Sequence, residues 1–96
     1  MTRLISEKAA AALYAGRDLK QNNTRVDGHA QRLYLHDNLI AEIINGVLFI
    51  TLACWQTLTT CERLNALNGV HITRRAGKAY LNGQEISPYQ WYKVEG

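Results

Sequence analysis

The sequence predicts a single α+β domain in which an antiparallel sheet packs against two helices. Short apolar segments are separated by turn residues, two segments have helix-capping signals, and an Asn-Gly pair lies between two apolar runs. A chain of 96 residues is too short for a second hydrophobic core. Apolar residues make up 47% of the chain and charged residues 20%, which is typical of a folded protein. We therefore expect residues 1–96 to form one small domain.

The first expected element is a helix over Glu7–Ala15, with Ser6 as its N-cap and Gly16 as its stop. Its alanine run favours helix without offering a large apolar face. A polar break follows at residues 21–23, and Thr24–Val26 then predicts a short strand.

A β-meander is expected next. Arg32–His36 alternates between polar and apolar side chains, which is typical of a strand with one buried face. A turn at Asp37-Asn38 leads into a strand over Leu39–Ile44, and Asn45-Gly46 then turns the chain into Val47–Cys54. Asn-Gly suits a type I′ turn, because both central residues need positive φ. Since Val47–Cys54 is apolar at nearly every position, it predicts a strand covered on both faces.

A second helix is expected over Thr60–Leu67. Thr59 and Glu62 have the spacing of a capping box, in which each side chain bonds the other residue's backbone amide. Trp55 precedes this helix, at the corner where the strand ends. We expect its ring to be buried against Leu64 or Leu67, with the indole N–H bonded.

The last third of the chain predicts a hairpin and a tail. Asn68-Gly69 ends the helix, and Val70–Arg75 and Lys78–Leu81 then form the hairpin. After Pro88, the segment Tyr89–Val94 is either an edge strand or a loose aromatic segment.

The sequence contains no recognised catalytic or metal-binding spacing. Cys61, near a helix N-terminus, is the best candidate nucleophile, but no histidine lies near it in the sequence to act as its base. We therefore expect Cys61 to fill the contact between helix and sheet. A group of His29, His36 and His71 with Cys54 and Cys61 matches no zinc-site spacing. We expect a protein that is not an enzyme and that holds no cofactor.

The composition of the chain indicates its cellular compartment and the charge of a possible partner. The first residues do not read as a signal peptide, and no run approaches the ~18 apolar residues of a membrane span. Two cysteines do not make a disulfide framework. We therefore expect a cytoplasmic protein with no membrane partner. The net charge of +3 and the pI near 9.1 are mildly basic and compatible with an acidic partner.

One basic and aromatic surface is expected around the hairpin and the tail. The candidate partner-binding residues are Arg74, Arg75, Lys78, Tyr80, Trp91 and Tyr92. Such a mixture suits phosphate contact and base stacking, and it equally suits a protein-binding hot spot. A charged turn that only keeps a sheet edge soluble is the third interpretation. If the hairpin is not the contact site, the second helix is the next candidate, with Glu62, Arg63 and Asn65 expected to be exposed.

Four segments between Asn23 and Gly83 carry a resemblance to known proteins. They are Asn23-Thr24-x-Val26, Leu35-His36-x-Asn38-Leu39-Ile40-Ala41, Ile50-x-Leu52-Ala53-x-Trp55-x-Thr57-x-Thr59-Thr60-x-x-Arg63-Leu64-Asn65 and Tyr80-Leu81-Asn82-Gly83. On these segments the chain resembles a group of small phage-encoded accessory proteins of unknown function. The resemblance implies a phage or prophage origin. It also implies binding to host machinery, because small phage accessory proteins commonly act in that way.

Anti-defence inhibitors, including anti-CRISPR proteins, are one prominent kind of such protein. The function we expect is therefore inhibition of a host defence complex, with a host protein or ribonucleoprotein as the partner. The alternative is direct nucleic-acid binding through the basic hairpin.

Overall fold

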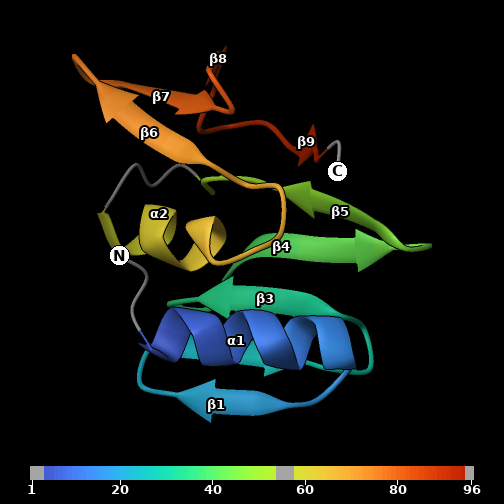
Figure 1. Ribbon diagram of the computed structural model, residues 1–96. Helices are drawn as coiled ribbons and strands as arrows, with labels where there is room; N and C mark the ends of the chain where they lie inside the picture. Colours follow the sequence, from blue (N-terminus) through green and yellow to red (C-terminus); the bar gives the residue numbers. More distant parts are fainter. Residues whose placement is uncertain (1–3, 54–57, 95–96) are drawn as a thin grey trace.

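The computed structural model describes residues 4–53 and 58–94 as two helices and nine strands. The elements are α1 (Leu4–Ala15), β1 (Leu19–Gln21), β2 (Thr24–Asp27), β3 (Arg32–Leu35), β4 (Asn38–Ile44), β5 (Val47–Ile50), α2 (Leu58–Asn65), β6 (Ile72–Arg75), β7 (Lys78–Leu81), β8 (Gln84–Ile86) and β9 (Tyr92–Lys93). Six strands pair in the order β1-β2-β3-β4-β5-β9, and β6-β7-β8 form a second sheet (Figure 1). Since all the pairings of the described strands are antiparallel, the expected α+β class is confirmed.

Both helices lie on the same side of the six-stranded sheet (Figure 1). α1 packs across β1, β2 and β3, while α2 contacts α1, β4 and β6. The largest fully buried apolar side chains come from the two helices, from β2 to β5 and from the chain just after β5, and they are Leu13, Val26, Leu33, Ile40, Ile50, Leu52 and Leu64. α2 is therefore the element through which the two sheets share one core.

The start of α1 differs from the sequence prediction. The helix begins at Leu4, so Ser6 lies inside it and is not its N-cap. The Ser6 side chain is fully buried, and its hydroxyl accepts a hydrogen bond of 2.8 Å from Nη1 of Arg63. A tertiary partner has thus replaced the local capping role that the sequence indicated.

The end of α1 is the predicted glycine stop. Gly16 has a φ of 71°, and the Arg17 amide donates to the carbonyl of Ala12 in the pattern of a Schellman motif. Gly28 packs directly against this end. A Cβ on Gly28 would lie 2.5 Å from backbone carbons of Gly16 and Arg17, so only glycine fits there.

The turns of the meander follow the predicted chemistry with one shift. The turn between β3 and β4 is formed by His36 and Asp37, with φ of 51° and 64°, and Asn38 already belongs to β4. The predicted turn at Asp37-Asn38 is therefore wrong by one residue. Both residues of Asn45-Gly46 have positive φ between β4 and β5, as predicted. The segment expected to be a polar break includes the end of β1, which pairs with β2.

β5 contradicts the expectation of a long strand covered on both faces. It ends at Ile50, and only Leu48 and Ile50 are buried, whereas Val47 and Phe49 are half-buried. Because the helices lie on one side of the sheet, alternate side chains of β5 point away from the core. Cys54 and Trp55 lie outside the described residues, and so does the expected packing of Trp55.

The bounds of α2 differ from the predicted range of Thr60–Leu67, because the helix begins and ends two residues earlier. The helix spans Leu58–Asn65, which places Thr59 within its first turn rather than ahead of it. The expectation that Arg63 is exposed is wrong, since only 4% of this residue is accessible. Its Nε donates to Oγ1 of Thr24 at 2.9 Å, and its Nη1 donates to Ser6.

The C-terminal third contains the predicted hairpin and one strand more. β6 and β7 pair around Ala76-Gly77, as expected. Asn82-Gly83 then makes a further turn into β8, which the sequence analysis missed because Gln84 and Glu85 carry no apolar signal. β9 pairs with β5, which confirms the edge-strand alternative for the tail.

The close contact at Gly28 generates a prediction about stability. Gly28→Ala places a methyl group against backbone atoms that cannot rotate away. It should lower the free energy of unfolding by about 3 kcal/mol, measured by urea denaturation. Gly77→Ala is the matched control, because its Cβ meets nothing within 4 Å and only the positive φ opposes it, at about 1 kcal/mol. Equal costs for the two substitutions would contradict the packing of Gly28.

Candidate partner-binding surface

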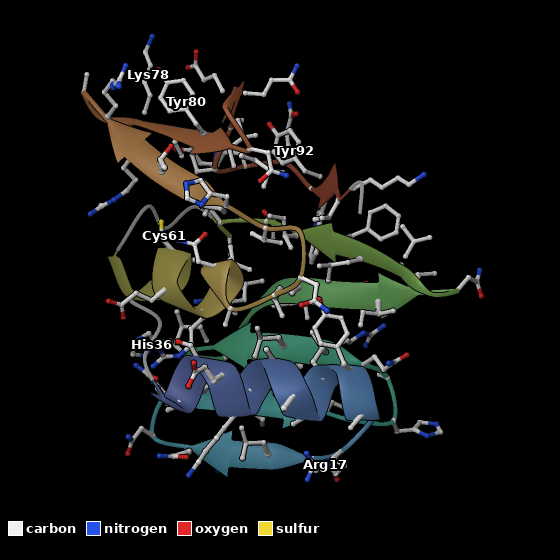
Figure 2. The ribbon with its side chains drawn as sticks, in the orientation of Figure 1. Arg17, His36, Cys61, Lys78, Tyr80 and Tyr92 are labelled. Atoms are coloured by element: carbon white, nitrogen blue, oxygen red, sulfur yellow. The ribbon has the colours of Figure 1, made fainter. Side chains whose placement is uncertain are left out.

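The outer face of the three-stranded sheet gathers part of the predicted site. Cross-strand partners share a face of a sheet, and Arg75 pairs with Lys78, while Thr73 and Glu85 both pair with Tyr80. All of these residues are exposed except Tyr80, which is half-buried. Lys78 and Tyr80 lie together on the sheet that stands away from α1 (Figure 2). We call this surface the hairpin face.

A hollow opens on the hairpin sheet. It has a volume of about 370 Å³, and its lining residues are Thr73, Arg74, Arg75, Tyr80 and Gly83. The Lys78 ammonium lies 3.9 Å from a Glu85 carboxylate oxygen, and both side chains are more than half exposed. An ion pair of this kind is weak in water, so Lys78 remains able to contact a partner.

Strand alternation separates Arg74 from the rest of the predicted cluster. Arg74 pairs with Ala79, which is fully buried, and it shares the face that Ile72 presents to α2. Its positive charge acts on Cys61 of α2. Strand register therefore places Arg74 on the side of the sheet that meets the helix, although its exposed side chain also lines the hollow beside Arg75 and Tyr80.

The aromatic residues of the tail also lie in different environments, because one packs against the core and two are exposed. Tyr92 pairs with Ile50, packs against the core, and accepts a 2.6 Å hydrogen bond from the Ser87 amide at its hydroxyl. Trp91 is 44% exposed, and Tyr89, which the sequence analysis did not select, is 76% exposed. Tyr92 thus fixes the tail to the six-stranded sheet, away from Lys78 (Figure 2), while Trp91 and Tyr89 are open to a partner.

Cys61 is a free thiol within the core, and only 5% of the residue is accessible. Its sulfur points from α2 toward the three-stranded sheet (Figure 2). Burial raises the pKa of the thiol, and the nearby positive charge of Arg74 opposes this only in part. A protonated, buried thiol is a poor nucleophile, which supports the packing role predicted from the sequence.

The described part of the chain contains neither a metal-ligand cluster nor a helix that could span a membrane. Within residues 4–53 and 58–94, no three His, Cys, Asp or Glu residues are grouped so that they could hold a metal ion. In the same residues, neither helix is long and apolar enough to cross a membrane.

A second basic and aromatic surface was missed by the sequence analysis. It is the face of the six-stranded sheet that points away from the helices, and we call it the open face. Its charged and aromatic side chains come from separate strands, and they are Lys20, Arg25, Asp27, Arg32, Tyr34, Glu42, Phe49 and Lys93. The strand register also places the apolar residues Leu39, Ile44 and Val47 on this face. The alternation of Arg32 and Tyr34 against Leu33 was the only local signal for it.

The molecule is a small α+β protein with two charged and aromatic surfaces. Its sequence matches the family model described as Kyanoviridae Gp96 protein over residues 2–95, and the chain belongs to this family of phage proteins. The phage origin that the resemblance implied is therefore confirmed at the level of the family. No curated protein and no solved structure matches the chain.

The burial of Cys61 generates a prediction about reactivity. In a Cys54→Ser chain, where Cys61 is the one remaining thiol, a disulfide reagent should label the native protein on the order of 100-fold more slowly than the unfolded protein. Labelling of the native protein at the rate of an exposed thiol would contradict the burial of Cys61.

The raised pKa of Cys61 also predicts the direction of a pH effect. The folded chain holds the proton more strongly than the unfolded chain, whose thiol has the ordinary pKa of 9.0. The stabilisation is therefore complete below this value and is lost as the pH rises through the pKa of the folded thiol. In urea denaturation, Cys61→Ala should remove this loss of stability at alkaline pH. If the free energy of unfolding of the variant depends on pH as that of the parent does, the prediction is wrong.

Proposed function

We propose that this phage protein acts without catalysis, by binding a macromolecular partner of its host through the hairpin face. The observation that supports this most is the grouping of exposed Arg75 and Lys78 with half-buried Tyr80 on one face. Arg75 and Tyr80 also line a hollow of about 370 Å³. Arginine and tyrosine give a large contact area for few fixed rotamers, which makes them common at binding hot spots.

A protein surface fits the hairpin face better than a nucleic acid does. The sequence offered three cations at this turn, but strand alternation gives Arg74 the opposite register position, so it shares the hollow with Arg75 but not the face of Lys78. Glu85 then adds a negative charge beside Lys78. Charges of both signs favour a partner with a complementary pattern, whereas a polyanion gains from the cations alone. Nucleic-acid binding at the hairpin is therefore the weaker alternative.

The most specific form of the proposal is inhibition of a host defence complex in the cytoplasm, in the manner of anti-CRISPR proteins. Membership of a phage protein family supports a host-directed role. A protein or ribonucleoprotein partner is the kind of target that a rigid, non-catalytic surface can block. Recovery of no stoichiometric host protein in a pull-down would count against this form of the proposal.

The hairpin face can be tested by charge reversal. Arg75→Glu with Lys78→Glu should reduce capture of the host partner by about 100-fold or more, because steering and charge-assisted bonds are lost together. Arg74 is left unchanged, since it faces α2. The matched control is Lys8→Glu with Arg17→Glu, which makes the same charge change on exposed residues at α1.

Both double variants should keep their thermal midpoint within a few degrees, because exposed charges contribute little to stability. Trp91→Ala tests the tail better than a truncation does, since removing the tail would also remove the buried Val94. Normal partner capture by the hairpin variant would place the contact site elsewhere.

A further inference from the structure

The charged and aromatic residues of the open face lie in two rows of cross-strand neighbours, and the apolar residues Ile44 and Val47 form a further pair on this face. In the first row, Lys20 pairs with Arg25, and Arg25 pairs with Tyr34. In the second row, Arg32 pairs with Glu42, Glu42 with Phe49, and Phe49 with Lys93. Both rows point away from the helices, because the alternate residues of these strands form the core.

The side chains of the first row are held in place by their neighbours. The Arg25 guanidinium lies 4.1 Å from the centre of the Tyr34 ring, which is a cation–π contact. Arg25 and Tyr34 are half-buried, while Lys20 at the edge is exposed. Together, the guanidinium and the ring make a preformed platform, because nucleic-acid bases stack on either of them.

In the second row, Arg32 Nε donates a 2.6 Å hydrogen bond to the Glu42 carboxylate, and this pairing raises the pKa of Arg32. Phe49 lies next to this pair and is half-buried. It is an aromatic ring in a sheet face that neither helix covers. Lys93 on β9 is exposed beside it.

Two hollows flank the first row. One has a volume of about 350 Å³ and follows β1 and β2, and the other has a volume of about 390 Å³ and lies at the ends of these strands. Lys20 and Arg25 line both of them. The second hollow also reaches Asn22, Asn23 and His36, whose side chains can donate and accept hydrogen bonds. Asp18 and Asp27 also line the first hollow, and Asp37 lines the second. A ligand that crosses this edge would therefore meet two cations and a group of polar side chains, with its anionic groups bound away from these carboxylates.

We propose that the open face binds single-stranded nucleic acid. Lys20, Arg25, Arg32 and Lys93 face outward, and both acidic residues among the paired residues of this face, Asp27 and Glu42, are cross-strand partners of Arg32. The net charge of these paired residues is therefore positive, and Lys20, Arg25 and Lys93 are left to attract a polyanion. Lys20, Arg25 and Lys93 contact phosphates, while Tyr34 and Phe49 stack against bases. A single strand exposes its bases to such rings, whereas a duplex buries the faces of its bases.

The test is fluorescence anisotropy with short labelled single-stranded DNA and RNA at ~50 mM salt. The variant is Lys20→Gln with Lys93→Gln, and the matched control is Arg75→Gln with Lys78→Gln, which removes the same charge from the hairpin face. We expect the open-face variant to bind at least about tenfold more weakly, with a log–log salt slope shallower by about 1.4 for two lost phosphate contacts. The control should lose no more than about twofold.

Stacking is tested by Phe49→Leu, which keeps an apolar side chain but removes the ring. It should weaken binding by about fivefold or more without changing the salt slope, because no phosphate contact is lost. The thermal midpoints of all variants must stay within a few degrees of the parent for the comparison to hold. Tighter binding to RNA or to DNA identifies the strand that the face prefers.

Three results would overturn the proposal. They are no binding of either oligonucleotide at ~50 mM salt, equal losses for the open-face and hairpin variants, and tighter binding to duplex than to single strand. If the open-face variant loses capture of a host protein while no oligonucleotide binds, the face is a protein contact instead. The hairpin face is tested separately, so failure here leaves the proposed function standing.

Discussion

The structure depends on the buried guanidinium of Arg63. This side chain of α2 donates hydrogen bonds to Thr24 on β2 at 2.9 Å and to Ser6 on α1 at 2.8 Å. Both hydroxyl residues are fully buried. A buried cation is costly unless hydrogen bonds satisfy its donors, so Arg63 is compatible with one placement of these elements only. It fixes α2 against segments 39 and 57 residues away in the chain.

The position of α2 in turn sets the position of the hairpin face. The Asn65 amide donates to the Ile72 carbonyl and accepts from the Ile72 amide, which joins the end of α2 to the start of β6. Asn82 makes a similar link, since it accepts from the His71 amide and donates to the Gly69 carbonyl. These side chains brace the chain between α2 and the three-stranded sheet. These polar contacts, together with those of Arg63, hold the three-stranded sheet against α2, and strand alternation then turns Arg75 and Tyr80 outward.

Local chemistry allowed much of the fold to be predicted. The turn at Asn45-Gly46 was predictable because both residues favour the positive φ that the turn needs. The turn at Ala76-Gly77 was predictable from Gly77 alone, since the positive φ of Ala76 is one that alanine disfavours. The sequence predicted Ser6 as a helix cap and Arg63 as an exposed residue. A serine at the start of a helix usually caps it, and an arginine within a helix is usually exposed. The buried partner of each residue lies in a distant segment, and no local pattern shows that. The apolar run of β5 was misread for a related reason, since Phe49 is apolar yet points to the open face.

The part of the candidate site whose residues lie close together in the sequence was predictable. Arg75, Lys78 and Tyr80 belong to one hairpin, so a turn signal was enough to bring them together. Arg74 was grouped with them only because strand alternation was not applied to the cluster. The open face spans strands from β1 to β9 and needs the pairing order before it can be seen. Four polar residues that carry the sequence resemblance, Thr24, Arg63, Asn65 and Asn82, make tertiary hydrogen bonds. This part of the resemblance is therefore accounted for by how the chain folds.

Arg63 couples α2 to β2 through its hydrogen bond to Thr24. The most direct measurement is a double-mutant cycle by urea denaturation, with Arg63→Met, Thr24→Val and the two combined. Arg63→Met alone should lower the free energy of unfolding by about 2–4 kcal/mol, because it leaves buried hydroxyl groups without their donor. The double variant should lose at least about 1 kcal/mol less than the sum of the single losses. Strictly additive losses, or a cost for Arg63→Met below about 0.5 kcal/mol, would contradict the account.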